Sequence, residues 1–140
     1  MKNIFITGGA GFIGSHLAEL LVKKGYKITI FDNFSIGNKN NLKNINKKIR
    51  LLNIDIRDFK KLLRNFEKFD VVFHLAALAD IVPSITNPKN YISTNVEGTS
   101  NILICCKKFK IKRIIYTASS SCYGIPKTYP TKEISEIDPK

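Results

Sequence analysis

The chain has 140 residues and a mass of 15.8 kDa, and 44% of its residues are hydrophobic and 24% charged. This length fits one domain, and the composition excludes a disordered or collagen-like chain. No apolar run reaches the ~18 residues that a membrane-spanning helix needs. The apolar stretch at the start is too short for a signal peptide, so we expect a cytoplasmic protein. Three Cys and two His without zinc-site or disulfide spacing predict no metal and no disulfide framework.

The formal net charge of +12 is large for a chain of this size. Such an excess attracts nucleic acid, anionic membranes or phosphorylated small molecules. The basic residues are scattered along the sequence, and no basic stretch is interleaved with aromatic residues that could stack on bases. We therefore expect a generally basic surface, with no nucleic-acid partner and no membrane partner.

Apolar, β-branched runs alternate with segments of helical periodicity along the chain. Residues 2–7 predict a strand, and residues 12–24 predict a helix that ends at Gly25. We expect further strands over residues 26–31, 49–54, 70–75 and 111–117, helices over residues 59–68 (with Asp58 as N-cap) and 89–109, and a short helix over residues 39–44. Strands that alternate with helices predict an α/β fold with a doubly wound parallel sheet, in the strand order 3-2-1-4-5.

Residues 119–140 show no strong periodicity and contain Pro126, Pro130 and Pro139. A structureless segment of this length is unusual at the end of a compact domain. We therefore expect the sheet to be incomplete at the C-terminus. Residues 1–124 would then form one α/β domain, and residues 125–140 an extended loop toward further structure.

Three glycines, Gly8, Gly11 and Gly14, lie between the first strand and the first helix. Gly8 suits a tight turn, Gly11 leaves room for a pyrophosphate at the helix N-terminus, and Gly14 suits close packing of the helix on the sheet. Asp32 ends the second strand about twenty residues further on, where a carboxylate can accept hydrogen bonds from an adenosine ribose. No Arg adjoins Asp32 to receive a 2′-phosphate, so the pattern favours NAD over NADP.

Several motifs occur together in chain order: TGGAGFIG at residues 7–14, DNFS at 32–35, DI at 55–56, HLAA at 74–77, TNVEGT at 94–99 and SSSCYG at 119–124. With them the sequence resembles the extended short-chain dehydrogenase/reductases, and within that family the nucleotide-sugar epimerases and dehydratases. The resemblance implies a Rossmann domain over residues 1–124 that binds NAD. It assigns the cofactor contacts to Gly8, Gly11, Phe12, Ile13, Gly14, Asp32, Asn33, Ser35, Asp55, Ile56, Leu75, Ala76, Ala77 and Asn95.

In the resembled enzymes a Tyr-x-x-x-Lys pair carries proton transfer while hydride passes between the sugar and NAD. Only Tyr123 and Lys127 have that spacing here, and Pro126 between them forbids a helix, so we interpret the spacing as a coincidence. The resemblance leaves Ser119 and Ser120 as the catalytic residues present, and places the missing pair beyond residue 140. The chain is then an amino-terminal part that is inactive alone.

The resemblance is strongest to UDP-glucose and UDP-N-acetylglucosamine 4-epimerases. It implies a UDP-sugar substrate once a C-terminal half completes the site, and a homodimer in the complete enzyme. A 4,6-dehydratase is an alternative, although Ser120 and Ser121 stand where dehydratases usually carry acidic residues. A non-catalytic dinucleotide-binding module is a second alternative, because fold alone does not imply activity.

Overall fold

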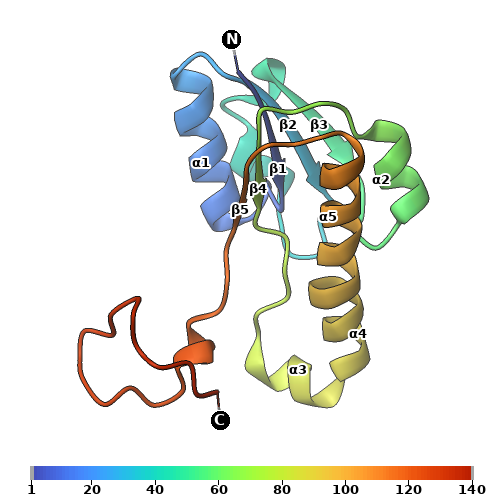
Figure 1. Ribbon diagram of the computed structural model, residues 1–140. Helices are drawn as coiled ribbons and strands as arrows, with labels where there is room; N and C mark the ends of the chain where they lie inside the picture. The colour runs from blue at the N-terminus through green and yellow to red at the C-terminus, as the bar shows by residue number, and fades with distance from the viewer. Residues whose placement is uncertain (1, 140) are drawn as a thin grey trace.

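A computed structural model describes residues 2–139 of the chain. Its centre is a five-stranded sheet in the order β3-β2-β1-β4-β5, and every pair of neighbouring strands is parallel (Figure 1). The strands are β1 (Asn3–Thr7), β2 (Lys27–Asp32), β3 (Ile49–Asn53), β4 (Val71–His74) and β5 (Ile114–Tyr116). The predicted fold class and strand order are confirmed.

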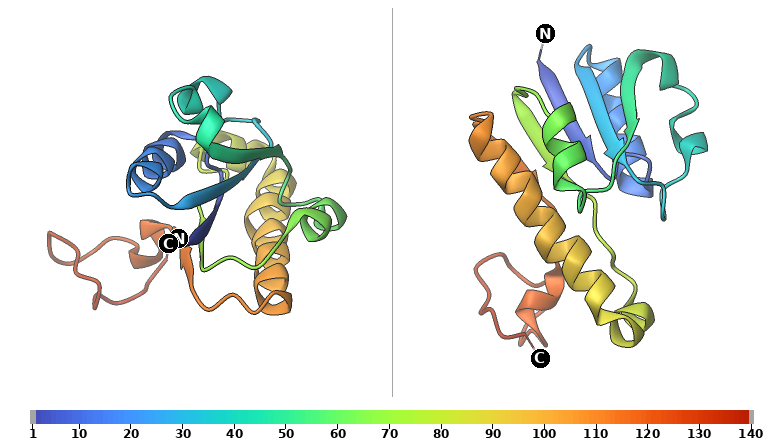
Figure 2. Two further views of the ribbon diagram at one scale, coloured as in Figure 1. Left: turned by 90° about the horizontal axis from the view of Figure 1, so that it is seen from above. Right: turned by 90° about the vertical axis from the view of Figure 1, so that its right-hand side faces the viewer.

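Helices cover both faces of this sheet. They are α1 (Phe12–Lys23), α2 (Phe59–Asn65), α3 (Ile81–Thr86), α4 (Pro88–Ile92) and α5 (Thr99–Lys108), with 3-10 turns η1 (Lys39–Leu42), η2 (Asn46–Lys48) and η4 (Ser120–Tyr123) and a π-helical turn η3 (Ser93–Gly98). α1 packs on one face, and α2 and α5 pack on the other (Figures 1 and 2). This arrangement is the doubly wound one that the sequence predicts.

Two predicted helix ends are confirmed by their local geometry. α1 ends just before Gly25, whose φ of +80° is accessible to a glycine at little cost. The Asp58 side chain accepts a hydrogen bond of 2.9 Å from the Lys61 N–H and caps α2. α2 is shorter than predicted because Phe66 is extended, with a ψ of 140°, and its ring is buried in the core.

Further elements differ from the prediction. The expected helix over residues 89–109 is a run of α4, η3 and α5, in which a π-helical turn interrupts the α-helical hydrogen bonding. α3 was not predicted, because six residues that include Pro83 are too short for helical periodicity to show. β5 has three residues instead of seven, because it pairs only with the short strand β4.

Side chains of β1 alternate between two hydrophobic clusters, one on each face of the sheet. Phe5 belongs to the cluster under α2 and α5, where its ring lies 4.6 to 5.1 Å from three other buried rings, those of Phe31, Phe66 and Phe69. Ile4 and Ile6 belong to the cluster under α1. The central strand is therefore buried on both sides, which is typical of parallel sheets.

After β5 the chain leaves the two helix layers and extends beyond the carboxyl ends of the strands (Figure 1). Between Gly124 and residue 139 it forms no helix or strand. It folds back on itself, since the Asp138 N–H donates to the Cys122 carbonyl at 3.0 Å and Lys127 lies 3.7 Å from Glu136. Residue 140, the last of the predicted loop, lies outside the described residues.

Removal of the Phe5 ring is expected to destabilise the domain strongly. Phe5 is 0% exposed and touches three rings, so Phe5→Ala should lower the free energy of unfolding by about 3–5 kcal/mol in urea titrations. The matched control is Phe12→Ala, because the Phe12 side chain is 79% exposed and should change stability by less than about 0.5 kcal/mol. Equal losses in the two variants would contradict the assigned core.

Candidate nucleotide-binding cleft

A cleft opens at the carboxyl ends of the strands, where the strand order reverses between β1 and β4. Doubly wound sheets bind ligands at this switch point. Its walls come from the loop after β1, the residues after β2 and β3, the loop after β4, and the start of the α4–α5 run. The lining residues are Gly8, Gly11, Phe31, Asp32, Asn33, Ser35, Ile36, Gly37, Ile54, Asp55, Ile56, Arg57, Leu75, Ala76, Ala77, Leu78, Asn90 and Thr94.

The glycine loop is packed so closely that neighbouring backbone excludes a side chain at two positions. Gly8 has a φ of +68°, and a Cβ there would lie 2.8 Å from the backbone nitrogen of Ala76. A Cβ on Gly14 would overlap the carbonyl oxygen of Gly8. The prediction that Gly14 lets the helix pack on the sheet is therefore wrong. At Gly14 the start of α1 packs on the backbone of the glycine loop.

Gly11 opens the N-terminus of α1 toward the cleft. It is the N-cap residue, supplies no capping side chain, and a Cβ there would meet only the Gly8 oxygen, at 3.3 Å. The first-turn N–H groups of α1 have no intrahelical acceptors, and no acidic side chain lies in that turn. Bare amides at the positive end of a helix dipole suit an anion.

Phe12 and Ile13 lie in this first turn, with side chains 79% and 63% exposed, and neither side chain lines the cleft. The same holds for Gly14, which is buried against the loop. The structure therefore offers the backbone N–H groups of these residues at the helix N-terminus, and contact of the Phe12 and Ile13 side chains with a cofactor stays a prediction.

Asp32 lies at the end of β2 and is 7% exposed. One carboxylate oxygen accepts the Ala10 N–H and the other accepts the Phe34 N–H, each at 2.8 Å. A carboxylate has about four lone-pair sites, so each oxygen retains one. The loop bonds fix the carboxylate at the cleft wall, and the remaining sites can accept hydroxyl groups of a ligand.

Asp55, after β3, lies in a different hydrogen-bonding environment. One of its oxygens accepts the backbone N–H and Nε of Arg57, at 2.8 and 3.0 Å. The other accepts Nη2 of Arg57 and Nδ2 of Asn33, at 2.7 and 2.8 Å. The Arg57 side-chain hydrogen bond is the largest cause that lowers the pKa of Asp55 to about 2. All four acceptor sites are thus used, and a base could reach the Asp55 carboxylate only by replacing one of these bonds.

Arg57 also connects this corner to the far wall, because its Nη1 donates to Oδ1 of Asn90 on α4 at 2.7 Å. Asn33 in turn accepts the N–H and hydroxyl of Ser35, at 3.0 and 2.8 Å. The predicted residues Asn33, Ser35 and Asp55 therefore form one connected network. Arg57 and Asn90 were not predicted, since neither has a local pattern that marks it as part of a site.

His74 ends β4 and is 1% exposed. Its Nε2 lies 2.9 Å from the hydroxyl of Thr99, which itself donates to the Asn95 carbonyl at 2.7 Å. Because the single hydroxyl proton of Thr99 is used, we assign the ring proton to Nε2. Burial lowers the pKa of His74 to about 4, so the ring is neutral at pH 7 and its Nδ1 is an acceptor.

The other ring nitrogen connects to the cleft. Nδ1 of His74 lies 2.6 Å from the Thr7 hydroxyl, which donates to it. The same Thr7 oxygen accepts the N–H groups of Leu75 and Ala76, both at 3.2 Å. This buried chain of hydrogen bonds fixes the start of the loop after β4, where the predicted residues Leu75, Ala76 and Ala77 line the cleft.

Asn95 holds the next part of that loop. Its side-chain oxygen accepts the Leu78 N–H at 2.9 Å, and its side-chain nitrogen donates to the Leu78 carbonyl at 2.8 Å. Asn95 does not itself line the cleft. The structure therefore gives it a positioning contact, and direct contact with a cofactor stays a prediction.

The predicted catalytic residues Ser119 and Ser120 lie after β5, at the same end of the sheet, but they do not line the cleft. Both are exposed, and the Ser119 hydroxyl accepts the Ser121 N–H at 3.2 Å at the start of η4. Tyr123 ends η4, and Lys127 follows Gly124 and Pro126 without a helix, as predicted. Tyr123 and Lys127 line a separate hollow within this segment.

Ten of the fourteen predicted cofactor residues line the cleft: Gly8, Gly11, Asp32, Asn33, Ser35, Asp55, Ile56, Leu75, Ala76 and Ala77. Among residues 2–139, no group of three or more His, Cys, Asp or Glu side chains is arranged to hold a metal ion. No helix in this part of the chain is long and apolar enough to cross a membrane.

The parallel sheet, the glycine loop against a helix N-terminus and the acid at the end of β2 define a Rossmann dinucleotide-binding domain. The family model described as GDP-mannose 4,6 dehydratase matches residues 5–140. The chain belongs to this family of extended short-chain dehydrogenase/reductases.

Known proteins of several activities resemble the chain. A UDP-N-acetyl-alpha-D-glucosaminuronate decarboxylase from Bacillus cytotoxicus is 42% identical over 88% of this chain and 38% of its own length. The UDP-Glc/GlcNAc 4-epimerase structure from Campylobacter jejuni has a TM-score of 0.93 and 30% identity, over 100% of this chain and 44% of that one. A UDP-glucose 4-epimerase from Brucella ovis, solved in complex with NAD, has a TM-score of 0.90 and 33% identity, over 100% and 42%. The chain thus spans less than half the length of these proteins.

Acid is expected to weaken the fold through His74. Its pKa in the folded state lies below the ordinary value of 6.5, so below that value the unfolded state binds more protons. The free energy of unfolding should therefore fall by about 2 kcal/mol between pH 7 and pH 5. Urea titrations at the two pH values measure the loss. The Asp55 carboxyl does not contribute, because its pKa of about 2 in the folded state and its ordinary value of 3.8 both lie below pH 5.

The chain offers a matched control in its second histidine, His16, which is exposed. His16→Gln should leave the decline from pH 7 to pH 5 unchanged. His74→Gln should remove most of it, at the cost of lower stability at pH 7. A decline of unchanged size in His74→Gln would show that other groups cause it.

Proposed function

We propose that this chain is the NAD-binding part of a nucleotide-sugar epimerase of the UDP-sugar 4-epimerase type. The observation that carries the proposal is a pair of neighbouring features in the cleft, joined by the 2.8 Å hydrogen bond from the Ala10 N–H to Asp32. One is the bare N-terminus of α1 behind Gly11, and the other is Asp32 with one acceptor site left on each oxygen. Amide donors for a pyrophosphate and a fixed carboxylate for a ribose are what a dinucleotide requires.

The cleft also supplies walls for the rest of such a ligand. Ile36 and Ile56 give an apolar surface near Asp32 for the adenine base. Ala76 and Ala77, small residues of the loop held by Thr7 and His74, line the continuation toward the nicotinamide. The backbone N–H groups of Phe12, Ile13 and Gly14 would receive the phosphate oxygens.

NAD is the dinucleotide favoured over NADP. A 2′-phosphate on the ribose held by Asp32 would bring a second negative charge against that carboxylate. Arg57 is the basic residue that lines the cleft, and three of its side-chain nitrogens are bound to Asp55 and Asn90. These bonds keep the Arg57 guanidinium from binding a 2′-phosphate.

In the proposed reaction, bound NAD supplies a reversible acceptor for the hydride at C4 of the sugar. Ser119 and Ser120, which follow β5 at the cleft end of the sheet, would hydrogen-bond the reacting sugar hydroxyl. We propose that residues 1–124 hold NAD and that residues 125–140 lead toward the part that binds the UDP-sugar. The complete enzyme would be a cytoplasmic homodimer.

A 4,6-dehydratase is the second candidate, and the description of the matching family model favours it. The residues that follow Ser119 favour the epimerase, because they are Ser120 and Ser121 and not acids. A non-catalytic dinucleotide-binding module would have the same cleft and would differ from the enzyme only in having no turnover. The Tyr123–Lys127 geometry, with no helix between them, is compatible with such a module.

Calorimetric titration of the chain with NAD tests whether the cleft binds this cofactor. Gly11→Val should weaken NAD binding by about tenfold or more, because its side chain would block amide–phosphate hydrogen bonds worth about 1.5–3 kcal/mol. Ile13→Ala is the matched control, since it shortens an exposed side chain and keeps its backbone N–H. NADP is the control ligand and should bind more weakly than NAD. Equal NAD affinity in both variants would contradict the assigned pyrophosphate site.

Turnover by the chain tests the assignment of the missing proton-transfer pair. We expect no conversion of UDP-glucose to UDP-galactose by the purified chain with NAD, because Tyr123 and Lys127 are not presented on a helix toward the cleft. A coupled assay for the product measures it. Turnover that is lost in Tyr123→Phe would assign the base to Tyr123 and overturn this view.

A further inference from the structure

Basic residues that are scattered in the sequence come together at one end of the fold. In a parallel sheet all strands begin at the same edge, and the crossover helices end there too. Side chains at these strand starts and helix ends therefore meet. The basic residues at this edge, all exposed, are Lys2, Lys23, Lys24, Lys27, Lys47, Lys48, Lys68, Lys107, Lys108, Lys110, Lys112 and Arg113, which we call the basic end.

Nearly all of the net charge resides there. Of the eleven acidic residues in the chain, only Asp70 stands among these positions, and the neighbouring Arg50–Glu67 ion pair is neutral. The other eleven basic residues are balanced by ten acidic ones. Within residues 2–139, none of the twelve basic-end side chains forms an ion pair. Of the net charge of +12, all but one unit is thus concentrated opposite the cleft.

Helix stability explains only part of this concentration. Lys23, Lys107 and Lys108 lie in the last turns of α1 and α5, where a cation interacts favourably with the helix dipole. That reason does not apply to Lys2, which precedes β1, or to the other cations that precede strands. Uncompensated like charges repel one another and oppose the compact state, so the arrangement calls for a partner of opposite charge.

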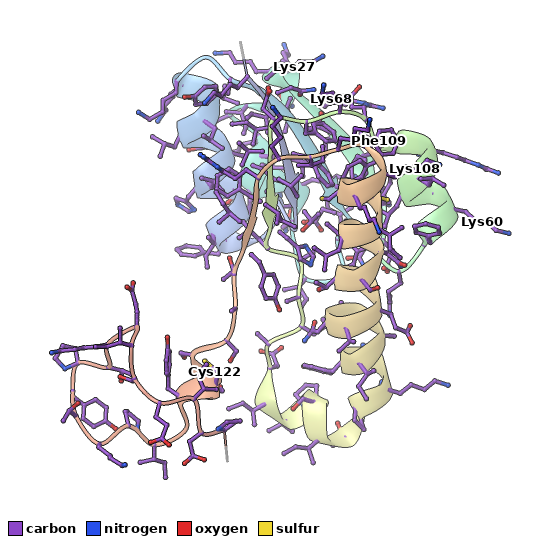
Figure 3. All side chains as sticks on the ribbon, in the orientation of Figure 1. Lys27, Lys60, Lys68, Lys108, Phe109 and Cys122 are labelled. Carbon is purple, nitrogen blue, oxygen red and sulfur yellow. The ribbon has the colours of Figure 1, made fainter. Side chains whose placement is uncertain are left out.

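The basic end is broad in two directions. Along one, it follows the row of five strand starts, and along the other it reaches from the end of α1 on one face to the end of α5 on the opposite face. In Figure 3 Lys27 and Lys68 are labelled at the top of the molecule, and Lys108 lies lower, at the C-terminal end of α5. Neither the cleft nor the hollow near Tyr123 is lined by a basic-end residue.

The composition of the basic end limits the kind of anion it can recognise. Eleven of its cations are lysines, which act as point charges, and only Arg113 offers the bidentate geometry that reads base edges. None of its residues is among the exposed large hydrophobic side chains, and its nearest rings, Tyr26 and Phe109, are only partly exposed. Stacking on bases and insertion into lipid tails are both disfavoured.

We propose, in place of the expectation from the sequence that the chain has no membrane partner, that the basic end is a docking surface for an anionic lipid bilayer. A bilayer is a plane of negative headgroups, so it can contact a patch that is broad in both directions, whereas a nucleic-acid duplex presents its charge along a line. Each lysine near such a surface adds to the attraction between the protein and the anionic lipids. This attraction decays over about a Debye length. The contact is peripheral and salt-sensitive. It directs the nucleotide cleft, at the other end of the strands, away from the membrane.

Vesicle sedimentation tests this proposal. At low salt the chain should bind vesicles of phosphatidylglycerol and phosphatidylcholine, fail to bind pure phosphatidylcholine vesicles, and be released by about 0.5 M NaCl. Replacement of Lys23, Lys27, Lys108 and Lys112 by Gln should weaken binding by at least about tenfold. A second set at the same end, Lys2, Lys47, Lys68 and Arg113 to Gln, should weaken it similarly and guards against a folding defect in the first.

The matched control removes the same charge elsewhere. Lys43, Lys60, Lys61 and Lys89 lie outside the basic end, and their replacement by Gln lowers the net charge equally. We expect at most about a threefold loss of vesicle binding in this variant. Equal losses of vesicle binding in all variants would show that binding depends on the net charge and not on where the charges lie. Absence of vesicle binding, or tighter binding to a DNA duplex than to the anionic vesicles, would also overturn the proposal.

Discussion

The close backbone contact at the end of β1 is the constraint on which the site depends. Gly8 turns the chain against the backbone of Ala76, and Gly14 brings the start of α1 onto the carbonyl of Gly8. A Cβ at either position would separate elements that must touch. Because backbone meets backbone there, the N-terminus of α1 reaches the cleft without a side chain in front of it. The proposed binding of a pyrophosphate in the cleft depends on that packing.

Buried polar side chains give the remaining cleft walls their positions. Thr7, His74 and Thr99 join β1, β4 and α5 through hydrogen bonds whose donors and acceptors are all satisfied. Asn95 fixes the next part of the loop, because its side chain accepts the Leu78 N–H and donates to the Leu78 carbonyl. A neutral imidazole suits this place because it can both donate and accept inside a low-dielectric core.

Two carboxylates near the cleft show how hydrogen bonding separates similar groups. Asp32 is fixed by two backbone N–H groups and keeps acceptor capacity for a ligand. All acceptor sites of Asp55 are used by Arg57 and Asn33. Asp55 thus acts as a clamp that orients Arg57 toward Asn90. Residue type is the same at both positions, and the surrounding donors decide whether the carboxylate keeps acceptor sites or has none left.

The sequence by itself determined the fold class, the glycine loop and the position of Asp32, because each depends on local periodicity or spacing along the chain. The strand order then followed from the usual order of a doubly wound sheet. Only the tertiary structure decided what depends on contacts between distant residues. The clamp from Asp55 through Arg57 to Asn90 joins two elements that share no local pattern. Lysines that look scattered in the sequence gather at one end because parallel strands all begin at the same edge.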